Sequence, residues 1–165
     1  MIVDVERNDL GRICRYGTVK VKELAVLETY ATVFHLVSTI VGTLSKNKGP
    51  IDCLKACFPG GSITGAPKIR AMEIINELEP TRRDVYTGAM GYIGFNGNLD
   101  LAIVIRSLIM KDKKAYLYTG GGIVADSDPH EEYEETINKA KALIMALSNR
   151  KRLVNEQSKA LHCIS

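Results

Sequence analysis

The sequence predicts an α+β fold in which an antiparallel meander sheet is flanked by helices. Two apolar, β-branched runs at 86–95 and 98–110 are separated by Asn96-Gly97, which suits the positive-φ positions of a two-residue hairpin turn. A third run at 115–119 follows a short charged loop, so three strands follow one another along the chain. Near the C-terminus, apolar residues recur at steps of four and three, which predicts a helix with one core-facing stripe.

The remaining elements are shorter. Residues 18–28 begin with alternating valine and lysine, which favours a strand. Residues 31–44 space their apolar side chains by three and four, which predicts a buried helix despite the β-branched content. Residues 51–57 are predicted as another short helix. A further helix follows the glycine-rich loop 58–65 and ends at Pro80.

Composition indicates an ordinary soluble protein with one domain, residues 1–148, and a polar basic tail, residues 149–165. The chain has 165 residues, 45% hydrophobic and 25% charged, which excludes a disordered tail and a disulfide scaffold. Its 22 basic and 19 acidic residues give a net charge of +3, too small to indicate a nucleic-acid partner. The N-terminus lacks the order of a signal peptide and no run suits a membrane span, so we expect a cytoplasmic protein.

The last predicted helix carries the first candidate site. Glu132, Glu135 and Lys139 step by three and four, so they share one stripe of that helix. Two carboxylates on one stripe suit a hard cation such as Mg²⁺, which takes few protein oxygens and keeps water or substrate ligands. The alternative is structural, because acidic residues favour a helix N-terminus and the Glu135–Lys139 spacing is that of a surface ion pair.

A second candidate is the glycine triplet Gly120–Gly122, with Arg106 on the predicted neighbouring strand. Consecutive glycines can expose backbone N–H groups that bind an anion, or they can serve a turn that needs positive φ. Arg106 stands among apolar residues on its predicted strand face, so its guanidinium must find an anionic partner or reach water.

Four further residues each have two interpretations. Ser62 and Thr64 can present hydroxyls to an anion, or Thr64 can cap the following helix. His35, inside an apolar segment, is either a buried structural histidine or a catalytic one. Tyr86, at the start of its predicted strand, offers a phenol to a ligand or packs at the strand end.

Taken together, five segments resemble the chorismate-utilising enzymes, which include component I of anthranilate synthase and of aminodeoxychorismate synthase. The resemblance runs from residue 1 to about residue 147 and implies a two-sheet chorismate-binding fold, of which this chain is the C-terminal part and is incomplete at the N-terminus. The segments are MIVDVERNDLGR, HLVSTI, FPGGSITGAPKIRAMEIINELEP, GAMGYIGFNGNLDLAIVIR and GGGIVADSDPHEEYEET.

Within that family, the loop Pro59–Gly65 is most similar to the aminodeoxychorismate synthase branch. The resemblance then implies conversion of chorismate and ammonia to 4-amino-4-deoxychorismate, toward folate, with a glutamine amidotransferase subunit supplying the ammonia. The alternative is anthranilate synthase component I, or a catalytically incomplete fragment of either enzyme. Family members carry a further metal-binding glutamate and a nucleophilic lysine upstream of the segment that begins here, so we expect the isolated chain to be inactive.

The same resemblance assigns site roles to ten residues of this chain. It implies a Mg²⁺ ion bound by Glu132 and Glu135. It implies a substrate-binding group that comprises Tyr86, Arg106, Gly121, Gly122 and Lys139. It implies a catalytic group that comprises His35, Ser62 and Thr64.

Overall fold

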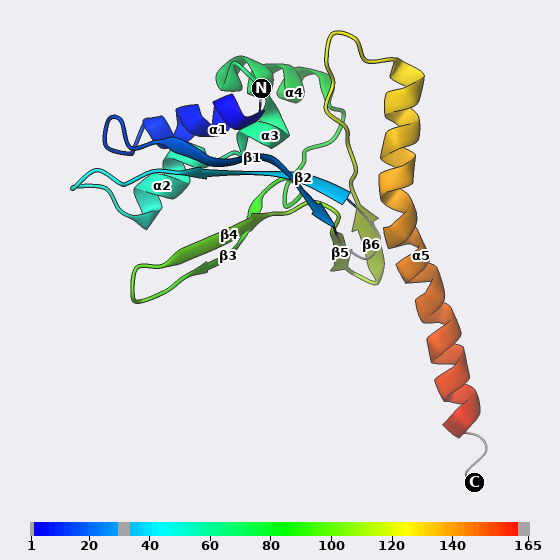
Figure 1. Cartoon of the computed structure of the whole chain (residues 1–165). Helices are drawn as coiled ribbons and strands as arrows, with labels where there is room; N and C mark the ends of the chain where they lie inside the picture. Colours follow the sequence, from blue (N-terminus) through cyan, green and yellow to red (C-terminus); the bar gives the residue numbers. More distant parts are fainter. Residues whose placement is uncertain (1, 30–33, 162–165) are drawn as a thin grey trace. The chain divides into compact units, whose positions relative to one another are not determined.

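The computed structural model describes residues 2–29 and 34–161, apart from the side chains of residues 35 and 149–161. The chain separates into two compact units, Met1–Ile103 and Val104–Ser165. Figure 1 labels the helices and strands of both units. Helices and antiparallel strands are mixed, as the sequence predicts. Among the described residues, no helix combines the length and the apolar character that crossing a membrane requires.

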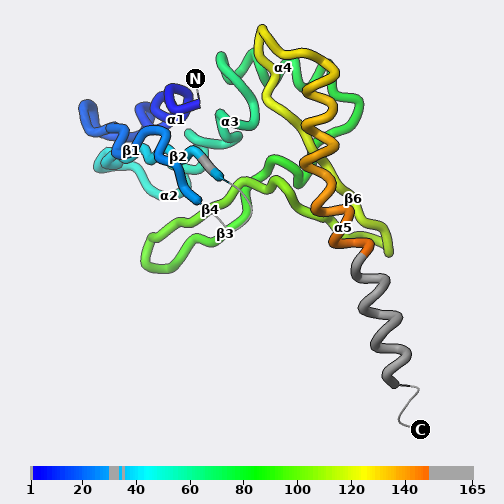
Figure 2. Tube along the Cα trace, turned by 45° about the vertical axis from the view of Figure 1, so that its right-hand side comes forward, coloured from blue at the N-terminus to red at the C-terminus, as the bar shows by residue number. Residues whose placement is uncertain are grey.

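In the first unit, the described residues form two antiparallel hairpins and four helices. The hairpins β1–β2 and β3–β4 are separate two-stranded sheets. Helix α1 lies beside the β1–β2 hairpin in both views, whereas the β3–β4 hairpin extends away from the helices (Figures 1 and 2). The elements are α1 (Ile2–Gly11), β1 (Lys20–Thr29), β2 (Phe34–Val41), α2 (Pro50–Cys57), α3 (Gly61–Thr64), α4 (Lys68–Leu78), β3 (Ala89–Ile93) and β4 (Leu99–Ile103).

The buried centre of the first unit is small and lies where α1, α2 and the start of β1 meet. Ile13, Cys14 and Ala56 are buried there, and Leu10, Val19 and Cys53 pack against them. Helix α3 packs closely on α1, since a Cβ atom at Gly61 would overlap the side chain of Val5. Glycine at position 61 therefore permits the close approach of these two helices.

One buried ion pair fastens three helices of this unit together. Lys68 Nζ, at the start of α4, lies 2.6 Å from Asp9 Oδ2 on α1 and donates to the Cys57 carbonyl at the end of α2 at 3.4 Å. The Asp9 side chain is only 3% exposed. A buried carboxylate requires such a partner, because desolvation without one is costly.

The second unit, as far as it is described, consists of one hairpin, a connecting segment and a long helix. The hairpin pairs β5 (Leu108–Lys111) with β6 (Lys114–Leu117), and the helix is α5 (Pro129–Leu161). Asp128 caps α5, since its Oδ1 accepts the N–H groups of His130 at 2.9 Å and Glu131 at 3.1 Å. The helix continues to Leu161, so it includes residues 149–161 of the predicted polar basic tail.

The predicted helix at 31–44 is wrong, because its described part contains strand β2. Leu36 and Val37 pair with Leu27 and Val26 of β1 in antiparallel register. Valine, isoleucine and threonine are stiff at χ1 and fit a pleated surface, so pairing with β1 overrides the helical spacing. His35 therefore lies on a strand, opposite Glu28.

The predicted three-strand meander is also wrong in detail. Residues 98–110 do not form one strand: β4 ends at Ile103 and β5 starts at Leu108, and Arg106 between them has φ +50°. A left-handed backbone interrupts the ladder, so the two hairpins stay separate. The first turn differs as well. The N–H of Gly97 donates to the Gly94 carbonyl at 2.9 Å, and only Gly97 of the Asn-Gly pair has positive φ, +83°.

Candidate active site

The two candidate carboxylates of α5 approach the same point on the glycine segment. A Cβ atom at Gly121 would lie 2.6 Å from Glu132 Oε2 and 3.9 Å from Glu135 Oε2. The i,i+3 spacing places both side chains on one helix face, and the connecting segment passes along that face. Gly121 has no positive φ, so the glycine serves a close approach to the carboxylates and not a left-handed turn.

The two oxygens of the Glu132 carboxylate differ in their hydrogen bonds. Ser127 Oγ donates to Glu132 Oε1 at 2.5 Å. Glu132 Oε2 is buried, and within the described part of the chain it has no hydrogen-bond partner. A buried carboxylate oxygen without a donor is unusual in proteins, and a water molecule or an ion can supply the missing partner.

Lys139 lies one helical turn beyond these carboxylates. Its Nζ lies 2.6 Å from Glu135 Oε1 and donates to the Gly120 carbonyl at 3.1 Å. The Glu135 side chain is 53% exposed, so this ion pair by itself adds little stability. The pair does bring the Lys139 amino group to the glycine segment, which also approaches Glu132.

The donor set fits a hard divalent cation. The orphaned Glu132 oxygen and the neighbouring Glu135 oxygen are carboxylates, which Mg²⁺ prefers, and Mg²⁺ usually keeps several water ligands beside one or two carboxylates. Among the described residues, no cluster of three or more His, Cys, Asp or Glu side chains could hold a metal alone. Any cation here would therefore take its remaining ligands from water, substrate or other protein groups.

Groups that can bind an anion lie in the same unit. Within the part of the chain that the structure describes, neither Gly121 nor Gly122 donates its N–H to another group. Arg106 is exposed, and its guanidinium has no partner among the described residues. The predicted strand position of Arg106 is wrong, since the residue lies in the loop between β4 and β5, but its guanidinium is available to an anionic ligand.

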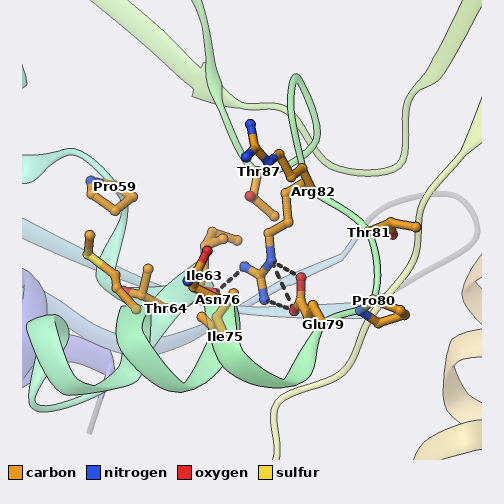
Figure 3. Close-up of a pocket in the computed structure, with 12 residues that line it drawn as sticks. Pro59, Ile63, Thr64, Ile75, Asn76, Glu79, Pro80, Thr81, Arg82 and Thr87 are labelled. Atoms are coloured by element: carbon orange, nitrogen blue, oxygen red, sulfur yellow. Dashed lines mark hydrogen bonds and ion pairs between the residues drawn. The ribbon is translucent and has the colours of Figure 1, made fainter.

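Thr64 and Ser62 belong to the one-turn helix α3 in the first unit. Thr64 Oγ1 donates to the Gly60 carbonyl at 3.0 Å, and Pro67 occupies the N-cap of α4, so the alternative of Thr64 as that helix cap is wrong. Ser62 is exposed. Thr64 lines a cavity of about 470 Å³ between α3, α4 and the segment after α4 (Figure 3).

Arg83, which links two of the elements around this cavity, was not predicted from the sequence. The guanidinium of Arg83 forms a forked contact with Glu79, with Nε at 2.8 Å from Oε2, and NH1 donates to the Ile63 carbonyl at 3.0 Å (Figure 3, dashed lines). The hydrogen bonds and charge of Glu79 raise the pKa of Arg83, so the guanidinium of this pair stays charged at all ordinary pH values. Glu79 is the C-cap of α4 and Arg83 lies beyond its end, so helical spacing predicted neither the ion pair nor the bond to Ile63.

Tyr86 and His35 are the other two predicted site residues in the first unit. Tyr86 lies in a turn three residues before β3, so the prediction that it opens the strand is wrong; its N–H donates to the Arg83 carbonyl at 2.9 Å. The side chain of His35 lies outside the described residues, and its backbone is part of β2.

Solved structures of two chorismate-utilising enzymes share this fold. Anthranilate synthase component I from Streptococcus pneumoniae TIGR4 has a TM-score of 0.80 and 49% identity, covering 86% of this chain and 32% of that one. A putative 2,3-dihydroxybenzoate-specific isochorismate synthase, DhbC, from Bacillus anthracis has a TM-score of 0.78 and 28% identity, covering 89% of this chain and 39% of that one. The fold of this chain is thus shared with part of each of these two synthases.

Residues 1–145 match the chorismate binding enzyme family, and the chain belongs to that family. Among curated relatives, anthranilate synthase component 1 of Synechocystis is 55% identical over 152 residues, covering 89% of this chain and 30% of that protein. The same component of Bacillus caldotenax is 50% identical over 161 residues, covering 98% of this chain and 32% of that protein. The chain therefore spans about a third of the length of these relatives.

These relatives do not support the predicted lean to the aminodeoxychorismate branch. That lean depended mainly on the loop Pro59–Gly65, with the helix ending Glu77–Pro80 pointing the same way. The two curated relatives named above match 89% and 98% of the chain, and both are anthranilate synthase component 1. A loop of seven residues says less about which branch of the family the chain resembles than sequence identity over about 150 residues does.

Proposed function

We propose that this chain forms part of a chorismate-utilising enzyme whose product is anthranilate, and that its α5 carboxylates bind Mg²⁺. The product assignment is supported by the identity to anthranilate synthase component 1 of several organisms. The aminodeoxychorismate product is the second candidate, and the loop Pro59–Gly65 is the feature that favours it.

The observation that supports the cation site most directly is the orphaned oxygen of Glu132. It is buried beside Gly121, near Glu135 Oε2, and among the described residues it receives no hydrogen bond. A Mg²⁺ ion bound by Glu132 and Glu135 would neutralise a substrate carboxylate and stabilise a departing hydroxide.

The remaining residues of the second unit have complementary tasks toward an anionic substrate. The N–H groups of Gly121 and Gly122 and the guanidinium of Arg106, which have no partner among the described residues, would orient a second carboxylate of chorismate. Lys139, held between Glu135 and the Gly120 carbonyl, would add positive charge at the same place.

A segment exchange tests the product assignment. We would replace the matching segment of the Synechocystis anthranilate synthase component 1 with residues 1–145 of this chain and supply chorismate, Mg²⁺ and ammonium. We expect anthranilate, detected by chromatography and fluorescence. A parallel exchange that keeps the host sequence at the loop 59–65 separates the contribution of this loop. Formation of 4-amino-4-deoxychorismate only when the loop of this chain is present would overturn the assignment and favour the second candidate.

The proposed enzyme also uses a glutamine amidotransferase subunit as its source of ammonia, in keeping with relatives that are named as component 1 of anthranilate synthase. The exchange protein gives the test. With a glutaminase subunit added, glutamine should replace ammonium as the nitrogen source. Product formation with ammonium that glutamine never supports in the presence of that subunit would contradict this partnership.

A further inference from the structure

Ser127 lies in the turn before α5 and makes two hydrogen bonds through one oxygen. Its Oγ accepts the N–H of Val124 at 3.1 Å and donates to Glu132 Oε1 at 2.5 Å. The backbone of the same turn is closed by a bond from the Ser127 N–H to the Val124 carbonyl at 3.1 Å. The turn therefore fixes the position of the Ser127 hydroxyl, and the hydroxyl fixes one oxygen of the Glu132 carboxylate.

The consequence is an asymmetric carboxylate. The Oε1 atom of Glu132 is occupied by the serine, whereas Oε2 is buried, without a described partner, and directed to the point where a Cβ of residue 121 would lie. A glutamate side chain has three rotatable bonds and would otherwise sample several orientations. A short bond from a hydroxyl to an ionised oxygen is strong enough to select one of them.

We infer that Ser127 is a positioning residue that holds Glu132 so that Oε2 faces the cation. This inference rests on the proposed cation site. Hydrogen bonds to metal-binding carboxylates orient them, and loss of such a bond typically weakens metal binding by tenfold to a hundredfold. Ser127 was not singled out by the sequence analysis, since a serine five residues before Glu132 follows no helical spacing.

Binding of Mn²⁺ to the chain, followed by NMR, tests the inference without any measurement of activity. Mn²⁺ is a hard divalent cation like Mg²⁺ and broadens the signals of nearby nuclei. In the wild-type chain we expect broadening of the Gly121 and Glu132 amide signals first. In Ser127→Ala, the Mn²⁺ concentration for half-maximal broadening should rise about tenfold.

A matched pair of variants isolates the hydroxyl. Ser127→Thr and Ser127→Val have similar side-chain shapes, but only threonine can donate to Glu132. The threonine variant should stay within about twofold of the wild type, whereas the valine variant should follow Ser127→Ala. Asp128→Ala serves as the control for the start of the helix, since it removes the α5 cap and leaves the bond to Glu132 in place.

Each outcome separates this inference from the cation site itself. Glu132→Gln should abolish the broadening, and wild-type broadening in that variant would overturn both the cation site and the role of Ser127. Loss of broadening in Glu132→Gln together with wild-type behaviour of Ser127→Ala and Ser127→Val would overturn the role of Ser127 alone. Equal weakening in Asp128→Ala and Ser127→Ala would show an effect of the helix start and would also overturn it.

Discussion

At the residue scale, Gly121 and Gly122 are neighbours with different environments. A Cβ atom at Gly121 would lie 2.6 Å from Glu132 Oε2, whereas a Cβ at Gly122 would have no atom within 4 Å. Because Oε2 is the far end of a flexible side chain, Gly121→Ala should displace the carboxylate at little cost in stability. We expect the Mn²⁺ affinity to fall about tenfold, since a displaced ligand weakens metal binding.

Gly122→Ala is the control for this experiment, because neither glycine has a positive φ. Calorimetric titration with Mn²⁺ should show wild-type affinity for Gly122→Ala, with both variants melting near the wild-type temperature. Equal affinities of the two alanine variants would contradict the placement of the cation at Glu132.

Arg106 is the second prediction at this scale. Its exposed guanidinium has no partner among the described residues, as expected for a group that binds substrate and not for a structural ion pair. Arg106→Lys keeps the charge but loses the planar fork, so the KM for chorismate in the exchange protein should rise about tenfold.

The companion substitution Arg82→Lys tests whether the effect is specific to position 106. Arg82 is also exposed and also lacks a described partner, so its variant should retain the wild-type KM. An unchanged KM in Arg106→Lys would exclude the role of Arg106 as a carboxylate clamp.

At the element scale, Arg83 joins the end of α4 to α3. Its fork on Glu79 and its bond to the Ile63 carbonyl are partly shielded from water, and the Arg83 side chain is 25% exposed. A lysine cannot form the fork and the carbonyl bond together, so Arg83→Lys should lower the free energy of unfolding by about 1 to 2 kcal/mol.

Urea unfolding of the chain measures this effect, with Arg70→Lys as the comparison. Arg70 pairs with Glu73 along α4, but their side chains are 61% and 57% exposed, so this variant should cost less than about 0.5 kcal/mol. Equal losses in the two variants would show that Arg83 does not brace α3.

Cys57 gives a pH-dependent prediction at the end of α2. Burial, helped by Cys53 and the nearby acidic groups Asp9 and Glu6, raises the pKa of the Cys57 thiol to about 12. The reactive thiolate is therefore scarce at pH 8, and its fraction grows as the pH rises toward the pKa. Alkylation of Cys57 by iodoacetamide at pH 8 should be about tenfold to a hundredfold slower in the folded chain than in urea.

Mass spectrometry of peptides from timed samples gives the rates for each cysteine. The folded chain should show a steep increase in Cys57 alkylation between pH 8 and pH 10, while the rate in urea should level off above the ordinary thiol pKa of about 8.5. Folded and unfolded rates that agree at pH 8 would contradict the burial of this thiol.

At the scale of the whole molecule, apolar surface is abundant and the buried set is small. Leu27 and Leu36 pair across β1 and β2 yet are 60% and 72% exposed. Exposed apolar patches of this kind promote association. We expect light scattering after gel filtration to show oligomers whose fraction grows with concentration.

The double variant Leu27→Ser, Leu36→Ser should reduce this association, because it removes an apolar pair from an exposed strand face. Circular dichroism should stay close to that of the wild type. A wild-type chain that remains monomeric up to high concentration and does not bind a hydrophobic dye would overturn the prediction.

Much of the architecture was predictable from local signals. The helices at 51–57 and after Pro67, the strand at 18–28 and the cap at Asp128 follow from periodicity, proline and capping residues, which act within a few positions of the chain. The strand nature of residues 34–41 was missed, because pairing with β1 decides it and the apolar spacing alone fits a helix.

By itself, the sequence determined the mixed helix and strand class, the family resemblance and the common stripe of Glu132, Glu135 and Lys139. Only the tertiary structure decided that Gly121 lies against Glu132, that Ser127 holds one oxygen of that carboxylate, and that Arg83 bonds to Ile63. The physical reason is the distance along the chain over which each interaction acts. Helical spacing and capping depend on neighbours along the chain, whereas the orientation of a carboxylate depends on contacts that folding brings together.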